Sequence, residues 1–172
     1  NRLRYYKNVC FPLDGPRNYL HENIGYNYRM SNLVAAVGLA QVEKADEYKK
    51  MRIHNNELYR KYLKDVSGII FQLVPEGYLS VSWMNAILVD ASKYGHTKDE
   101  LCAYLKENNV DTRQLFVGMH RQPSLKKYGC DCSGEYIVTD KLTAQGLYLP
   151  SASCLNESDI YGICKLIKAF QQ

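Results

Sequence analysis

Residues 21–31 carry several side chains that can bind an anion. Within eleven positions they include the imidazole of His21, the carboxamide of Asn27 and the guanidinium of Arg29, and they lead to a helix start at Ser31. An amide donates to phosphate oxygens, and a guanidinium holds a carboxylate or phosphate with a planar fork of donors. The same polar groups could instead tie the loop to neighbouring backbone. The residue types therefore favour an anionic ligand and leave a structural role open.

Residues 111–123 form a second polar segment, in which cations are mixed with apolar side chains. Arg113, His120 and Arg121 could meet a diphosphate. Met119 and Phe116 could cover a ring of the same ligand. The structural alternative is a strand edge with solvated arginines, which are common on protein surfaces. This segment is the second candidate ligand site.

The sequence contains no complete catalytic set. It lacks the usual glycine-rich nucleotide loops, the His-Glu-x-x-His zinc motif and the Gly-x-Ser-x-Gly nucleophile turn. His54 has no apparent carboxylate partner and is interpreted as a surface residue. Residues 146–151 alternate apolar side chains ahead of a proline, which predicts a short buried strand rather than a site.

Segments typical of strands and of helices alternate along the chain, and this order predicts an α/β fold. Apolar residues at helical spacing follow Ser31 and predict one long helix over residues 33–64. Thr97 and Glu100 have the spacing of a capping box at the start of another helix. Asn156 is a suitable N-cap for the last helix.

The remaining elements follow from turn residues and from β-branched runs. Residues 1–32 are expected to be a loop, and residues 119–134 another, with Pro123 as its breaker. Strands are expected at residues 69–74, 81–89, 110–117 and 147–150, and further helices at residues 97–108, 137–144 and 156–170.

The composition is that of an ordinary soluble globular domain, with 172 residues, 46% of them hydrophobic and 23% charged. No apolar run approaches the roughly 20 residues that cross a bilayer. The N-terminus lacks a methionine and the apolar core of a signal peptide, so we expect a domain cut there rather than a targeting segment. The net charge of +4 arises in residues 1–64, where 12 Lys and Arg stand against 6 Asp and Glu. Because these charges are mixed, a solvated helix face accounts for most of them.

Six cysteines would permit disulfides, but their spacing argues against them. Cys102 and Cys164 lie among apolar helical neighbours, where a free thiol behaves as a small hydrophobe. Cys130 and Cys132 lack a second pair or a nearby His, so no zinc site is expected. We expect reduced thiols without metal, and with them a cytoplasmic location.

Three blocks of the sequence, in the same order, closely resemble the DegT family of aminotransferases. They are residues 21–41, residues 112–123, and residues 146–151 followed by 155–160, and together they span nearly all of the chain. Residues 82–84 and 119–123 look most similar to the perosamine-synthase-like members of that family.

The resemblance implies both a fold and an activity. The fold would be the small C-terminal α/β domain of a fold type I pyridoxal-phosphate aminotransferase: residues 1–32 end the large domain, residues 33–64 form a long linking helix, and residues 65–172 are the small domain. The activity would transfer an amino group, usually from glutamate, to a keto-sugar carried on a nucleotide diphosphate, by a homodimer that serves polysaccharide biosynthesis. In the family's order the cofactor-binding lysine lies upstream of Asn1, so this chain alone is expected to be inactive.

The resemblance also implies roles for particular residues. Asn27 matches the asparagine that reaches the pyridoxal phosphate of the neighbouring subunit, and His21 and Arg29 would line the same substrate site. The family pattern leaves open whether Arg29 holds a donor carboxylate or a substrate phosphate. The later loop would face the nucleotide-sugar with three residues, Arg113, Met119 and His120.

Two other classes of function compete with this interpretation. The chain could be a free-standing, non-catalytic interaction or dimerisation module derived from such a domain. A nucleic-acid binder is supported only by the basic excess near the N-terminus, because no helix-turn-helix or aromatic basic strand is apparent. Neither nucleic acid nor membrane is therefore expected as a partner.

Overall fold

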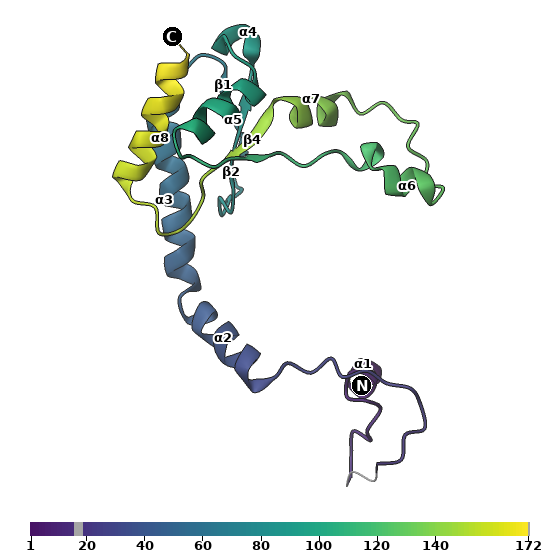
Figure 1. The fold of residues 1–172 in the computed structure, drawn as a ribbon. Helices are drawn as coiled ribbons and strands as arrows, with labels where there is room; N and C mark the ends of the chain where they lie inside the picture. Colours follow the sequence, from purple (N-terminus) through teal and green to yellow (C-terminus); the bar gives the residue numbers. More distant parts are fainter. Residues whose placement is uncertain (16–18, 172) are drawn as a thin grey trace. The chain divides into compact units, whose positions relative to one another are not determined.

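The computed structural model describes residues 1–15 and 19–171. These separate into two compact units, Asn1–Ala45 and Asp46–Gln172. The helices are α1 (Arg2–Lys7), α2 (Asn32–Glu43), α3 (Ala45–Leu63), α4 (Ala91–Tyr94), α5 (Lys98–Glu107), the 3-10 turn η1 (Met119–Arg121), α6 (Pro123–Lys127), α7 (Ile137–Gln145) and α8 (Glu157–Phe170) (Figure 1). The strands are β1 (Ile69–Phe71), β2 (Asn85–Val89), β3 (Arg113–Gln114) and β4 (Gly146–Leu149).

The second unit is organised around a four-stranded antiparallel sheet in the order β1-β2-β4-β3. In the register, Ile69 lies opposite Val89, and Asn85 lies opposite Leu149. Along β2 the side chains alternate between buried and half-buried, as expected of a strand with two different faces. The fold is therefore mixed α/β, as the sequence predicted, with an antiparallel sheet.

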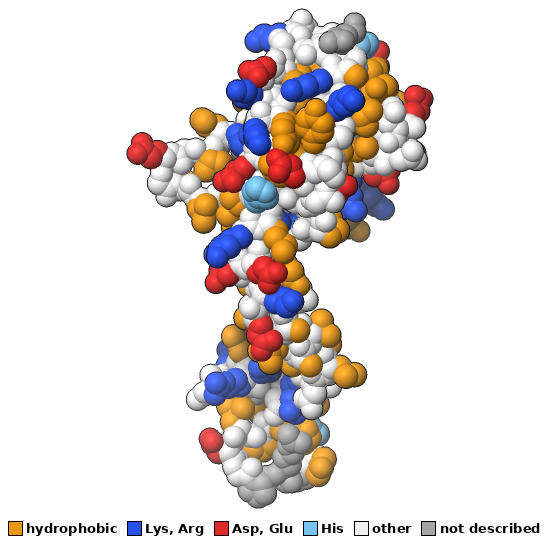
Figure 2. Space-filling model, turned by 90° about the vertical axis from the view of Figure 1, so that its left-hand side faces the viewer, with side chains coloured by type: hydrophobic (Ala, Val, Ile, Leu, Met, Phe, Trp, Pro, Cys, Tyr) orange, Lys and Arg blue, Asp and Glu red, His pale blue; other side chains and the backbone are white. Residues whose placement is uncertain are grey.

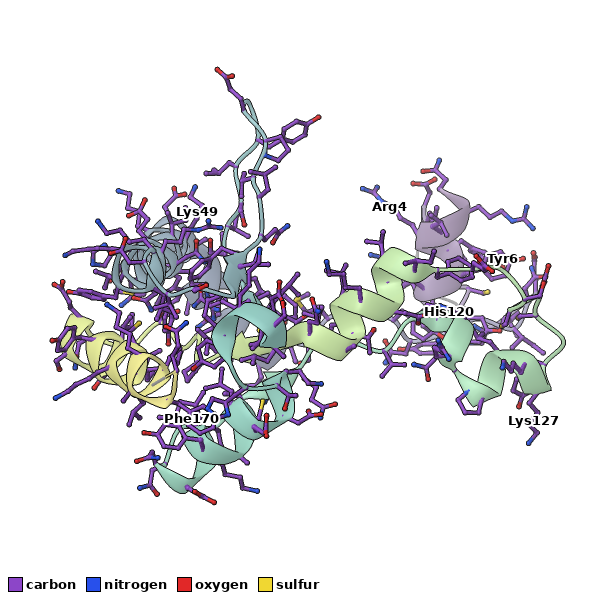
Figure 3. All side chains as sticks on the ribbon, turned by 90° about the horizontal axis from the view of Figure 1, so that it is seen from above. Arg4, Tyr6, Lys49, His120, Lys127 and Phe170 are labelled. Carbon is purple, nitrogen blue, oxygen red and sulfur yellow. The ribbon has the colours of Figure 1, made fainter. Side chains whose placement is uncertain are left out.

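Helices α3, α5 and α8 supply the other half of the core of this unit. The last helix shows why, since Ile160, Ile163 and Ile167 recur at helical spacing and are all buried. Figure 3 shows Phe170 between α8 and α5, where its ring stacks on Tyr104 with centroids 4.4 Å apart. Burying one such apolar side chain contributes about 1.5–3 kcal/mol. The other core residues are Leu58, Tyr59, Leu63, Val66, Ile87, Val89, Tyr94, Leu101, Leu105, Leu147, Leu149 and Cys164.

The helix starts of this unit confirm the capping predictions. Thr97 accepts a hydrogen bond from the Glu100 amide, and the Glu100 carboxylate accepts one from the Thr97 amide. Asn156 and Asp159 form the same reciprocal pair at the start of α8. Each pair satisfies two backbone donors that have no partner inside the helix.

The long helix predicted over residues 33–64 is two helices in the structure, α2 and α3, with Lys44 between them. The Lys44 backbone has φ −106° and ψ 7°, outside the helical values, and its amide donates to Gln41 and Val42. Asp46 and Glu47 then favour a new helix N-terminus, because carboxylates are stabilised there. No Gly or Pro marks this break. The division of the chain at residues 32/33 and 64/65 stays a prediction.

Other predicted boundaries differ from those in the structure. The expected loop over residues 1–32 contains α1, and the expected loop over residues 119–134 contains η1 and α6. Pro123 begins α6 instead of ending a segment, because the first helical position needs no amide donor. The strand expected over residues 81–89 starts only at Asn85, since Ser82 has a positive φ of 49°. β1 ends at Phe71, β3 is two residues long, and α4 lay outside the predictions.

Candidate functional site

Backbone hydrogen bonds hold the first candidate segment against α1. Asn8 and Asn27 form an antiparallel bridge, and the Val9 amide donates to the Tyr26 carbonyl over 3.1 Å. Gly25 lies so close to Cys10 that an added Cβ would be 2.6 Å from the Cys10 nitrogen, which explains a glycine there. The segment that bears Asn27 is thus fixed to the end of α1.

The bridge positions two of the predicted ligand side chains. Arg29 donates from one terminal nitrogen (Nη1) to Oδ1 of Asn8 over 3.2 Å, and its other donors stay available. The Asn27 side chain is exposed, and within the described part of the chain its carboxamide has no hydrogen-bond partner. Both residues can therefore donate to an anion without first breaking an internal bond to a carboxylate.

His21 is already engaged within the same unit. Its Nδ1 lies 2.7 Å from the Val9 carbonyl oxygen, and its ring stands against Phe11 with centroids 4.7 Å apart. This accounts for a structural role for His21 and leaves only Nε2 for a ligand. The ligand-binding role of His21 stays a prediction.

In the second unit, one carboxylate gathers two of the candidate cationic side chains. Asp140, in the first turn of α7, lies 2.9 Å from Nε2 of His120 and accepts two bonds from Arg121, at 3.0 and 2.7 Å. Tyr136 stacks on His120 with ring centroids 4.4 Å apart. Figure 3 labels His120 in η1, and Figure 1 shows the segment from η1 to α7 extending from the sheet. This His120–Asp140–Arg121 cluster ties the two ends of that segment together.

The cluster has a clear electrostatic cause and consequence. The Arg121 fork, helped by the hydrogen bond from His120, lowers the pKa of the Asp140 carboxyl to about 2. Asp140 is therefore a permanent anion at neutral pH. A hollow of about 300 Å³ lies beside it. Its lining includes His120, Arg121, Lys126, Glu135, Tyr136 and Asp140.

Arg113 lies in a different hollow of the same unit. It pairs with Tyr148 at the edge of the sheet and shares a hollow of about 630 Å³ with Arg52 and Trp83. Arg52 has a structural role, because it donates to the carbonyl oxygens of Trp83 and Ser151. Arg113 is exposed and offers its guanidinium to this hollow.

The structure thus distributes the predicted site residues over three places. Asn27, Arg29 and His21 share the first unit, Arg113 lines the sheet edge, and His120 joins the cluster around Asp140. Met119, 67% exposed, adjoins His120 in η1.

Sequence reasoning missed Asp140 and Tyr136, which hold His120. One signal was available in the sequence. Asp140 is the only carboxylate in the helix predicted over residues 137–144, and the loop that precedes this helix carries the cationic residues His120 and Arg121. Nothing in the spacing of 19 and 20 residues indicated that the loop folds back. Partners at such separations are set by the path of the chain.

The six thiols are unpaired in the part of the chain that the structure describes. Burial raises the pKa of the Cys164 thiol to about 12, so this cysteine is an unreactive core residue. Among residues 1–15 and 19–171, no group of three or more His, Cys, Asp or Glu is arranged to hold a metal. The helices of these ranges are too short or too polar to cross a bilayer.

Comparison with known proteins gives one consistent family. The model of the DegT/DnrJ/EryC1/StrS aminotransferase family matches residues 1–168. A GDP-perosamine synthase from Escherichia coli O157:H7 is 30% identical over 155 residues, which are 90% of this chain and 40% of that protein. A GDP-perosamine synthase from Vibrio cholerae is 29% identical over 156 residues, 90% of this chain and 41% of that protein.

A solved structure agrees with the sequence matches. The crystal structure of a DegT DnrJ EryC1 StrS aminotransferase from Brucella abortus is 26% identical to this chain and superposes with a TM-score of 0.75. The match covers 96% of this chain and 42% of that one. The chain spans about two fifths of the length of the relatives that it matches.

Proposed function

The chain belongs to the DegT/DnrJ/EryC1/StrS aminotransferase family, and from this membership we propose that it forms part of a pyridoxal-phosphate sugar aminotransferase. The whole protein would move an amino group from glutamate to a nucleotide-linked keto-sugar. The observation that carries the proposal is the match over residues 1–168, together with two perosamine synthases that each align with 90% of the chain.

The first unit fits a role toward the phosphate of the cofactor. The exposed Asn27 carboxamide is held by its backbone bridge to Asn8, and no described side chain occupies its donors. Such an amide can donate to a phosphate oxygen. In our proposal Asn27 serves the cofactor of the neighbouring subunit in a homodimer.

Pyridoxal phosphate, when bound, supplies an electron sink for amino-group transfer. The described residues bind and orient. Arg29 would hold an anionic group of a substrate with the donors that Asn8 leaves free, and His21 would line the same site through Nε2. In this proposal neither Arg29 nor His21 transfers a proton.

The second unit would contribute to recognition of the nucleotide-sugar. Arg113 offers a guanidinium in its hollow beside Trp83, which suits a phosphate next to a planar ring. Met119 is exposed and could cover an apolar surface of the ligand. His120 has Nε2 engaged by Asp140, so a ligand would meet its Nδ1 or its ring edge.

The direct test uses the full-length protein with glutamate and a panel of keto-sugar nucleotides, and measures aminated products by mass spectrometry. We expect one amino-sugar nucleotide to form with stoichiometric loss of glutamate. If the purified full-length protein aminates no member of the panel and binds no pyridoxal phosphate, the alternative of a non-catalytic interaction module is favoured.

A second test addresses Asn27 in the full-length dimer. A hydrogen bond to a charged acceptor is worth about 1.5–3 kcal/mol, so Asn27→Ala should weaken cofactor retention by about ten- to a hundredfold. Asn27→Asp should be worse, because it sets a carboxylate against the phosphate. Mixing Asn27→Ala subunits with subunits that lack the catalytic lysine should restore one active site per heterodimer. A confirmed heterodimer as inactive as either parent would show that Asn27 does not act across the interface.

A further inference from the structure

Three cationic side chains line one hollow of about 430 Å³ in the first unit. They are Arg4, Lys7 and Arg29, and the rest of the described lining is Asn8, Leu13 and Met30. The hollow has the size of small-ligand sites, which run from about 300 to 1,000 Å³. Its described lining contains no carboxylate, so within the hollow the three positive charges are not paired.

The fold brings these cations together from two separate segments. Arg4 and Lys7 are three residues apart on α1 and therefore lie on the same face of the helix. Arg29 reaches the hollow because the Asn8–Asn27 bridge lays its segment alongside the end of α1. The bond from Arg29 to Asn8 then fixes its guanidinium at the wall.

A structural explanation covers only part of this arrangement. Cations near a helix C-terminus complement the carbonyl groups there, which accounts for Lys7 and Arg4 on α1. It does not account for Arg29, which comes from the other segment and adds a third like charge. Residues 1–45 hold six Lys and Arg against three Asp and Glu, so +3 of the net +4 resides in this quarter of the chain. The face of this unit drawn in Figure 2 shows blue side chains beside orange apolar ones.

We propose that Arg4, Lys7 and Arg29 form a binding site for a phosphate oxyanion. Its occupant is either the phosphate of the cofactor or the diphosphate of the nucleotide-sugar. The choice between these two sources rests on the proposed function, whereas the binding of a phosphate oxyanion rests on the hollow alone.

The donors available in the hollow suit this ligand. Each guanidinium can hold two phosphate oxygens with parallel bonds, and Lys7 adds a compact charge. Because the Asn8 side-chain oxygen accepts from Arg29, the amide nitrogen of Asn8 remains as a neutral donor. An anion that carries at least two charges would relieve the mutual repulsion of the three cations.

The first experiment measures the binding of inorganic pyrophosphate to the 172-residue chain by calorimetry at an ionic strength of about 0.15 M, where the Debye length is about 8 Å. Arg4→Gln and Lys7→Gln should each weaken binding about tenfold or more, because each removes a charge-assisted contact. Arg2→Gln is the matched control: it removes the same charge from α1, but Arg2 lies over the Tyr6 ring and does not line the hollow. Its affinity should stay within about twofold of the original chain, since an exposed charge outside the site is screened.

Folding and packing are separated from charge by a conservative variant. Arg4→Lys keeps the charge but loses the planar fork of donors, so it should weaken binding less than Arg4→Gln does. The NMR chemical shifts of the backbone amides of α1 check that each variant keeps the local structure. Equal weakening by Arg2→Gln and Arg4→Gln, or no pyrophosphate binding by a chain with an intact α1 spectrum, would overturn the proposal.

The second experiment identifies the source of the phosphate in the full-length enzyme. If the site holds the nucleotide-sugar, Arg4→Gln raises KM for that substrate about tenfold and leaves cofactor retention unchanged. If it holds the cofactor, the same variant releases pyridoxal phosphate instead. A variant unchanged in both respects contradicts the inference even when the enzyme transaminates. Conversely, pyrophosphate binding by a full-length protein that never transaminates would leave this site standing and remove the proposed function.

Discussion

The two units of the chain differ most in what they bury. In residues 46–172, three helices and two central strands enclose one apolar core. Among the described residues of the first unit, Cys10 is the only hydrophobic side chain that is buried, while Leu3 and Ile24 are more than four-fifths exposed. Apolar burial is the main favourable term in folding, so the free energy of folding must come chiefly from the second unit.

This difference bears on the backbone that carries the proposed ligand-binding residues. Asn27 and Arg29 stand on backbone that is held by a two-residue bridge and a few polar contacts. Arg113 stands instead on a strand of the packed sheet. A ligand or partner that binds the first unit should therefore stabilise the structure of that unit substantially. The sheet that carries Arg113 is already held by the core of the second unit.

The largest expected effect is that of a core truncation. Leu101→Ala should lower the free energy of unfolding by about 2–5 kcal/mol, because Leu101 is fully buried and the change leaves a cavity. Leu3→Ala, the same kind of truncation in the first unit, should change it by less than about 0.5 kcal/mol. Urea unfolding of both variants measures the contrast. Similar losses would mean that the first unit shares the cooperative core.

A buried amide should show a smaller contrast of the same kind. Asn55 is 3% exposed and donates from Nδ2 to the Ala152 carbonyl over 3.1 Å. Asn55→Ala leaves that carbonyl without its donor and should cost about 1–3 kcal/mol. Asn23→Ala removes an exposed bond to the Tyr5 hydroxyl and serves as the control, with an effect near zero in the same urea titration. A costly Asn23→Ala would contradict the division between the units.

The two units can also be compared through the same kind of contact, a side-chain N-cap of a helix. Thr97→Ala removes the cap of α5 and should lower the free energy of unfolding by about 1 kcal/mol. Ser31 caps α2 in the first unit through a longer bond, 3.4 Å from the Val34 nitrogen. Ser31→Ala should leave the cooperative transition unchanged and reduce only the helical signal of α2, measured by amide chemical shifts. An equal shift of the transition by both variants would break the comparison.

The smallest effect on global stability is expected at Asp140, since its ion pair with Arg121 is partly exposed. Its folded pKa, about 2, lies below the ordinary value of 3.8, so its contribution is present above about pH 4 and lost as the pH falls toward 2. Carbon-13 titration of the carboxyl should give that low midpoint, and the Tyr136 ring signals should move with it. Arg121→Gln should raise the midpoint. A midpoint near the ordinary value in the unaltered chain would show that the cluster does not form in solution.

Much of the second unit could be predicted from sequence because its signals are local. The capping pairs at Thr97 and Asn156 each join residues three positions apart, and the apolar spacing of α8 repeats every three or four residues. The side-chain types of residues 21–31 likewise favour an anionic ligand, and this stays a prediction. Such features depend on neighbours in the chain and survive whatever the rest of the fold does.

What the tertiary structure alone decided depends on distant partners. Asp140 meets His120 and Arg121 because a loop folds back over about twenty residues, and no spacing rule encodes that path. Arg4 and Arg29 share a hollow only because a backbone bridge joins their segments. The energy of such contacts comes from charges and donors brought together in space, so sequence alone named the side chains and left their partners undetermined.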